Sequence, residues 1–184
     1  PVNFTTTGIT YCNSASENPL AIYHISNVTL NTINNNSVQS TFTDFTNIST
    51  TLEQGDTYTI TITPTTDNPG YFTFYSVWID YNLSFDDPGE QVFTLETSAE
   101  NPASGQFTVP TGINPVTTRM RVSLSNTGIP GPCDIFSFGE VEDYTIVINP
   151  EGYFYQDGVW TPANPSGLAT TADNITIMNG TTSF

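Results

Sequence analysis

The chain has 184 residues and carries 18 acidic side chains against two arginines and no lysine, so its formal net charge is −16 at pH 7. Proteins bind nucleic acids and anionic membranes mainly through lysine and arginine, so this charge argues against both kinds of partner. No run of about 18 apolar residues occurs that could span a bilayer. Hydrophobic residues make up 36% of the chain and aromatic residues 12%, which is enough apolar material for one core of ordinary domain size.

Strand signals dominate most of the chain, and helix signals are nearly absent. Residues 57–63 alternate strictly between threonine and apolar side chains, as a half-buried strand does. In chain order, the predicted strands are 20–30, 38–43, 57–63, 71–80, 91–95, 105–109, 119–124 and 141–148. Turn-forming residues between them lie at 34–36, 54–56, 68–70, 88–89, 104–105 and 111–112. Roughly eight or nine short strands at this spacing predict an all-β fold, a β-sandwich or jelly roll.

The pattern changes near residue 150, at Asn149-Pro150-Glu151-Gly152. We place a domain boundary there, with a sandwich over residues 1–150 and a short β-rich extension over residues 151–184. The extension is too short to hold a core alone, so it either packs on the sandwich or begins a second β-structured region that is truncated here. Because the chain ends at Phe184 inside an apolar pattern, we expect it to be a piece of a longer protein.

Acidic residues concentrate in two places, and both are candidate calcium sites because calcium takes six to eight oxygen ligands. The candidate metal ligands are Asp80, Asn82, Asp86, Asp87 and Glu90 in one loop, and Glu140, Glu142 and Asp143 near a late strand. The loop lacks the spacing of an EF-hand, so a solvated acidic turn between strands fits the same residues.

The strand 119–124 should direct Met120 and its neighbours of the same parity to the core, with both arginines facing out. Glu140 and Glu142 share one face of the late strand, and that parity continues into its apolar residues. Buried carboxylates need partners, which leaves two solutions open: salt bridges from Arg119 and Arg121 to these glutamates, or a bound calcium ion.

Cys12 and Cys133 are the only cysteines, and each lies beside turn-forming residues. Two cysteines without a nearby histidine make a poor metal site. They fit either a disulfide that joins distant parts of a secreted domain or two buried free thiols.

Six motifs in this order resemble the GEVED domain, a β-rich module of large secreted or surface proteins of Bacteroidota-type bacteria. The motifs are Tyr11-Cys12, residues 78–82, Pro88-Gly89-Glu90, residues 118–121, Pro132-Cys133 and, above all, Gly139-Glu140-Val141-Glu142-Asp143-Tyr144. The resemblance covers residues 9–149, and it implies that Cys12 and Cys133 pair. It also implies an accessory role, extracellular or cell-surface localisation, and export by type IX secretion. One departure is Leu83-Ser84, which stands where family members often carry an Asp-Gly-Asp-like insert; the shorter loop weakens the case for calcium at Asp80 and Asn82.

No pattern of catalytic residues stands out, so we expect no enzymatic activity. A glycosidase pair would have to come from Glu140 and Glu142, but acids adjacent on one strand do not easily straddle a sugar. Tyr81 and Phe85 flank the acidic loop and are candidates for glycan binding.

The sequence therefore predicts a non-catalytic extracellular module with a structural or adhesive role, with a carbohydrate-binding module as the alternative. Its expected partners are other domains of the same polypeptide, surface glycans, or a secretion or surface-attachment apparatus. Residues 157–181 resemble the opening of the repetitive β region found downstream in flavobacterial surface proteins.

Overall fold

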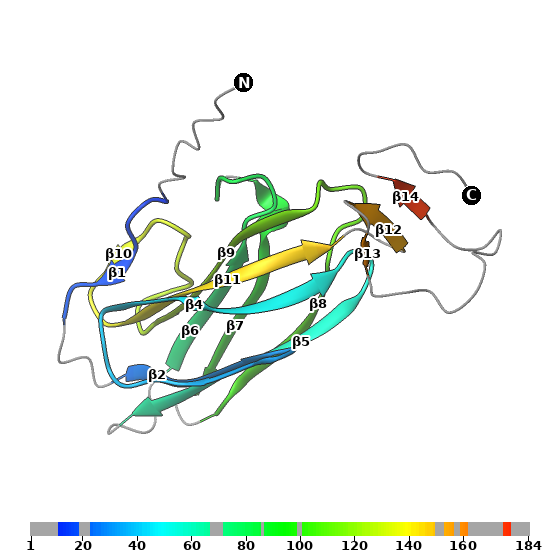
Figure 1. Ribbon diagram of the computed structural model, residues 1–184. Helices are drawn as coiled ribbons and strands as arrows, with labels where there is room; N and C mark the ends of the chain where they lie inside the picture. Colours follow the sequence, from blue (N-terminus) through cyan, green and yellow to red (C-terminus); the bar gives the residue numbers. More distant parts are fainter. Residues whose placement is uncertain are drawn as a thin grey trace.

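A computed structural model describes residues 11–18, 23–66, 72–85, 87–98 and 101–149, together with short strands at 153–156, 159–161 and 175–177. Two β-sheets pack face to face across these residues, and the interior between them is apolar (Figure 1). Within the described residues, one turn of 3₁₀-helix, η1 (Pro88–Glu90), interrupts the strands, and no helix is long and apolar enough to cross a membrane.

The larger sheet holds the late motifs of the sequence. In spatial order its strands are β4 (Phe42–Glu53), β11 (Gly139–Asn149), β9 (Val116–Ser125), β6 (Phe72–Ile79) and β7 (Gln91–Ser98). Strand β11 runs parallel to β4, and the other neighbours are antiparallel. Strand β11 is therefore an inner strand that pairs on both edges, which fixes the register of the motif it carries.

The smaller sheet comes mostly from the first half of the chain. Its strands, in spatial order, are β3 (Ile33–Asn36), β2 (Tyr23–Leu30), β5 (Thr57–Thr66) and β8 (Ala103–Thr108), and all neighbours are antiparallel. With the larger sheet this makes nine sandwich strands in the part of the chain that the structure describes, so the predicted all-β sandwich of eight or nine strands is confirmed.

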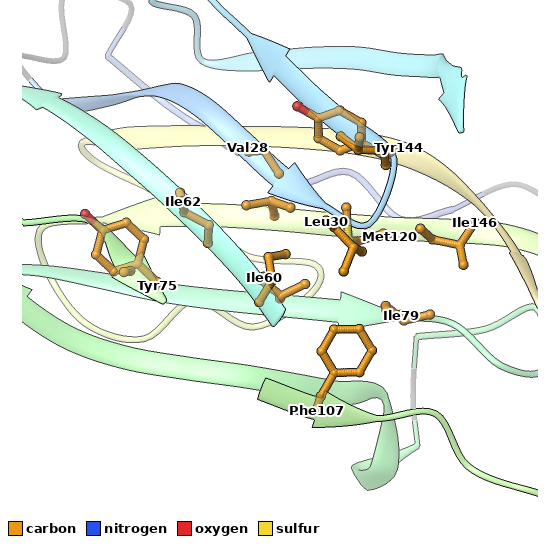
Figure 2. Close-up of a cluster of buried hydrophobic side chains, with 14 of the residues drawn as sticks. Val28, Leu30, Ile60, Ile62, Tyr75, Ile79, Phe107, Met120, Tyr144 and Ile146 are labelled. Atoms are coloured by element: carbon orange, nitrogen blue, oxygen red, sulfur yellow. The ribbon is translucent and has the colours of Figure 1, made fainter. Parts of the chain in front are cut away.

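Alternating side chains from the two sheets meet in one core. Figure 2 shows Leu30 and Ile60 of the smaller sheet close to Met120 and Ile146 of the larger one, and all four are fully buried. The prediction that Met120 and its same-parity neighbours face the core is confirmed, because Val122 is fully buried as well. This alternation leaves the opposite face of β9 for the two arginines.

Two predicted turns are strands. Residues 34–36 form β3, where the Asn27 side-chain amide donates to Asn34 Oδ1 at 2.9 Å and to Asn36 Oδ1 at 3.0 Å. The turn lies before this strand, at residues 31–32. Asn31 has a φ of 49°, in the left-handed region that asparagine adopts more readily than most residues. Gly105 lies inside β8, where a Cβ would come within 2.5 Å of the Phe93 ring, so this glycine serves a close contact between elements.

Strand β4 is much longer than predicted. The sequence predicted a strand at 38–43, whereas β4 begins at Phe42 and ends at Glu53. Its threonine, serine and asparagine residues hide it from a search for apolar alternation. It forms because β11 pairs with it along its length, with a shift of register after Tyr144.

Two short sheets complete the described structure. Strands β1 (Ala15–Ser16) and β10 (Ile135–Phe136) pair in parallel at one end of the sandwich (Figure 1). Strands β12 (Tyr153–Gln156), β13 (Val159–Thr161) and β14 (Ile175–Ile177) form a separate sheet, which agrees with a β-rich extension. The boundary near residue 150 stays a prediction, and most of residues 157–181 lie outside the described residues.

Candidate functional site

The acidic motif of the sequence lies at the start of β11, and its first residue allows β11 to approach β9 closely. Gly139 has a φ of 137°, and a Cβ at this position would lie 1.9 Å from the carbonyl oxygen of Leu124. Only glycine fits here without a shift of backbone. The glycine therefore sets the position from which the following acidic side chains point to either face of the sheet.

Glu140 and Glu142 project from the inner face of β11 into the space between the two sheets, and both are fully buried. Glu140 Oε2 accepts a hydrogen bond from the backbone N–H of Ile25, 3.0 Å away, where β2 is interrupted by a bulge. Glu142 Oε2 accepts one from the Tyr144 hydroxyl at 2.7 Å, and that hydroxyl accepts from the Asn35 side chain at 3.0 Å. The two glutamates thus connect the larger sheet to β2 and β3 of the smaller one.

This environment favours the neutral form of both glutamates. Burial raises the pKa of Glu140 to about 8, and the nearby negative charge of Glu142 adds to the increase. Burial also raises the pKa of Glu142. The remaining oxygens, Oε1 of each residue, have no hydrogen-bond partner among the described residues. Because neither side chain is exposed, a sugar chain cannot contact them in the folded protein.

Asp143 projects from the opposite face of β11 and pairs with both arginines. Arg121 holds it through two parallel bonds, Nε to Oδ1 and Nη2 to Oδ2, each 2.8 Å long. Arg119 Nη1 adds a third bond to Oδ2 at 3.0 Å. The predicted Arg–Glu salt bridges are therefore wrong: adjacent residues of a strand point to opposite faces, so the arginines meet Asp143 instead of Glu140 or Glu142.

Arg121 faces away from the core, as predicted, but it is not in solvent, since only 2% of it is exposed. Its Nη1 donates to the carbonyl oxygens of Cys12 at 2.9 Å and Pro132 at 2.6 Å. Its guanidinium carbon also lies 5.3 Å from the centre of the Phe85 ring. The segment that contains Tyr11 and Cys12, far from Arg121 in the sequence, thus covers the Arg121–Asp143 pair and shields it from water; we call this segment the N-terminal cover.

A disulfide holds this cover in place. Cys12 and Cys133 are bonded, with their Cα atoms 5.5 Å apart, and the described residues contain no free cysteine. This confirms the pairing and excludes two free thiols. The Tyr11 ring lies 5.0 Å from that of Phe85, and Arg119 stacks 4.2 Å above the Tyr11 ring.

The acidic loop after β6 binds its own backbone. Asp80 is fully buried, and its Oδ1 accepts from the backbone N–H of Asn82 at 2.8 Å and of Ser84 at 3.0 Å. Its Oδ2 accepts from the Tyr11 hydroxyl at 2.5 Å. Glu90 accepts from the N–H of Tyr81 at 2.9 Å through one oxygen and caps the 3₁₀ turn through the other. Carboxylates that accept several backbone bonds in this way stabilise a tight loop without a cation.

The predicted calcium ligands do not converge on one point. Asp80, Asn82, Asp87 and Glu90 share the loop, where the Asn82 side chain donates to Asp87. Glu140 and Glu142 lie inside the sandwich, whereas Asp143 lies on its outer face. Asp86 lies outside the described residues. Among the residues that are described, no group of three or more acidic, histidine or cysteine side chains could hold a metal ion, so calcium stays a prediction.

Of the two aromatic residues predicted to bind glycans, Phe85 is buried and Tyr81 is half-buried. Phe85 is only 7% exposed, because Tyr11 and Arg121 cover it. Tyr81 packs against the core, and its hydroxyl is buried. Neither ring offers an open platform to a sugar, and glycan binding at Tyr81 and Phe85 stays a prediction. Sequence reasoning also missed the role of Tyr11, although its place directly before Cys12 is a usable signal.

Comparison with the curated proteins finds no match for the chain. The family model of the GEVED domain matches residues 74–147, which extend from within β6 into β11 and include Cys133, both arginines and the Gly139–Tyr144 motif. The matched segment is shorter than the resemblance over residues 9–149, and it leaves out Cys12 and the strands β2 to β5. Residues 74–147 of this chain are a GEVED domain, a module of bacterial secreted proteins.

Proposed function

We propose that the chain is a non-catalytic, extracellular structural module of a larger secreted or cell-surface bacterial protein. The observation that carries the proposal is that the acidic residues of the GEVED motif are buried and engaged inside the fold. Glu140 and Glu142 lie between the two sheets, where Glu140 accepts a hydrogen bond from the smaller sheet. Asp143 pairs with Arg121 beneath the N-terminal cover. A motif used in this way builds a rigid unit and presents no reactive group to a substrate.

Three further features support an extracellular location. The disulfide between Cys12 and Cys133 needs an oxidising compartment to persist. The GEVED domain belongs to secreted proteins. A formal net charge of −16 also keeps a protein soluble and discourages non-specific association. In this proposal, type IX secretion exports the parent protein, and the module spaces or presents its neighbouring domains in a structural or adhesive role.

A combined activity and localisation experiment tests the proposal. The full chain and the Glu140→Gln variant are incubated with a panel of polysaccharides and with casein, and the products are measured by chromatography. We expect no product from either protein. Hydrolysis by the wild type that disappears in Glu140→Gln, with unchanged melting curves, would refute the non-catalytic role. On intact producing cells, an antibody against the chain should label the surface or the culture medium; a purely intracellular signal would refute the location.

A further inference from the structure

A pocket of about 340 Å³ lies beside the disulfide, and the structural role proposed above does not use it. Its lining residues come from the N-terminal segment, β4, β9 and β10, and they include Asn13, Phe42, Arg119 and Ile135. The volume falls within the range of small-molecule sites, roughly 300–1,000 Å³. Phe42 is 38% exposed and Ile135 is 55% exposed, so an apolar surface is open to a ligand here.

The walls of this pocket are held from several sides. The disulfide fixes Cys12, and the Ser14 hydroxyl donates to the carbonyl oxygen of Asp134 at 2.9 Å. The pairing of β1 with β10, visible at one end of the sandwich in Figure 1, fixes the next residues. A rigid pocket loses little entropy when a ligand binds, which favours affinity.

Arg119 supplies oriented hydrogen-bond donors to this pocket. One nitrogen bonds Asp143, and the guanidinium carbon lies 4.2 Å from the centre of the Tyr11 ring. The side chain is 25% exposed and lines the pocket, so a ligand in the pocket can reach it. The exposed amide of Asn13 adds a second planar group that both donates and accepts.

We propose that this pocket binds a neutral oligosaccharide. A sugar offers hydroxyls that donate and accept, which suit the planar edges of Arg119 and Asn13, and a C–H face that packs on the Phe42 ring. The aromatic and polar groups that a glycan site needs, which Tyr81 and Phe85 do not offer as an open platform, are thus found together beside the disulfide.

The charge balance selects a neutral ligand over an acidic one. Asp143 accepts from both arginines, and Asp44 on β4 lies within electrostatic reach of Arg119. The guanidinium charges are therefore largely compensated where the ligand would sit. The net charge of −16 further repels a polyanionic glycan.

Calorimetric titration of the full chain tests the proposal. The probes are cellohexaose, laminarihexaose, mannohexaose and xylohexaose, with hexagalacturonic acid as the charged comparator. We expect at least one neutral probe to bind, and we expect Phe42→Ser and Asn13→Ala each to weaken its binding by about tenfold or more. Phe72→Ser is the matched control, because Phe72 is 60% exposed but does not line the pocket, and this variant should bind like the wild type.

The outcomes separate clearly, provided that melting curves show both pocket variants to be folded. Lack of binding by every neutral probe would overturn the inference. Binding that survives both pocket variants would also overturn it, as would pocket-dependent binding of hexagalacturonic acid alone. None of these results bears on the structural module proposed above, which rests on the buried motif and on the activity and localisation experiment.

Discussion

Gly139 and Asp143 set the geometry of the acidic motif at the scale of single residues. The glycine permits the close approach of β11 to the backbone of β9. The aspartate neutralises Arg121 in a place that water does not reach. The first role depends on the missing side chain of Gly139 and the second on the charge of Asp143, so single substitutions test them.

Replacing Gly139 by alanine should destabilise the protein by roughly 3 kcal/mol, because the new Cβ strains the backbone and overlaps a carbonyl oxygen. Urea denaturation at neutral pH measures the loss. Gly89→Ala is the control, since no atom lies within 4 Å of a Cβ there and its backbone is not in the positive-φ region. Equal stability of the two variants would contradict the close approach described for Gly139.

Replacing Asp143 by alanine should cost about 3–5 kcal/mol, because it leaves the buried Arg121 without its carboxylate. The double variant Asp143→Leu with Arg121→Met should recover much of that loss, since it buries no charge. The comparison uses urea denaturation of the wild type, the single variant and the double variant. If the single variant is as stable as the wild type, then Arg121 is hydrated in solution and the covered ion pair is incorrect.

At the scale of elements, β11 joins the two sheets on one face and the N-terminal cover on the other. The acidic loop between β6 and β7 forms a second unit, in which the carboxylates of Asp80 and Glu90 accept backbone hydrogen bonds. Both elements use acidic side chains as connectors. Burial raises the pKa of Glu140 and Glu142 in β11 and also that of Glu90 in the loop.

The pKa of Glu140 gives the pH dependence a definite sign. It is raised from 4.5 to about 8, so the folded state binds this proton more tightly than the unfolded state. The contribution of Glu140 to the free energy of unfolding is fully present below pH 4.5 and is lost as the pH rises through about 8. Glu140→Gln should therefore flatten the decline in the free energy of unfolding over this window; Glu142, which has the same sign of shift, keeps part of the decline.

Urea denaturation at several pH values between 5 and 8, with wild type and Glu140→Gln in parallel, measures that difference. Glutamine keeps the size of the side chain and an oxygen that accepts from the Ile25 N–H, so it is the matched replacement. Two parallel stability profiles would show that Glu140 does not titrate differently in the folded state.

Chelation should leave the melting temperature unchanged, because the oxygens of Asp80 and Glu90 already accept hydrogen bonds from the loop itself. A calorimetric scan with and without chelator checks this, and re-addition of calcium is the control. A melting temperature that falls on chelation and returns with calcium would establish the calcium site that the sequence first indicated.

At the scale of the whole molecule, the disulfide joins the N-terminal segment to the part of the chain just before β11, across a sequence separation of 121 residues. It closes a long loop of the chain, and it also fixes the N-terminal cover over Arg121. Its removal should therefore act globally on stability and locally on the accessibility of the ion pair.

The double variant Cys12→Ser with Cys133→Ser should lose about 5 kcal/mol of stability, as the chain-entropy model gives for a loop of this length. It should also become sensitive to proteolysis near residue 12, because only hydrogen bonds and the ring contacts of Tyr11 would then hold the segment. Urea denaturation and limited proteolysis followed by mass spectrometry provide the two measurements. Unchanged stability together with an intact N-terminal segment would show that the cover does not need its covalent bond.

The sequence by itself determined the fold class, because threonine and apolar residues alternate with a period of two in strands such as β5 and β9. It also determined which side of β9 and of β11 faces the core, since that parity follows from the same alternation. The GEVED domain and the pairing of the two cysteines followed from motifs in the right order, now matched by the family model and by the disulfide itself. Most of strand β4 escaped prediction because its polar residues carry no such period; in the structure it pairs along its length with β11.

Only the tertiary structure decided which acid meets which base. Asp143 and Glu142 are neighbours in sequence, and the strand sends one to Arg121 and the other toward the opposite sheet. It also decided that Tyr11 and the disulfide cover Phe85 and Arg121, and that a pocket opens beside them. The physical reason is sequence separation: the contacts of Tyr11 and Cys12 join residues about 70 to more than 100 positions apart, and even Arg121 and Asp143 are 22 positions apart. Local alternation fixes the face on which a side chain lies, but the segment that covers that face is set by the packing of the whole chain.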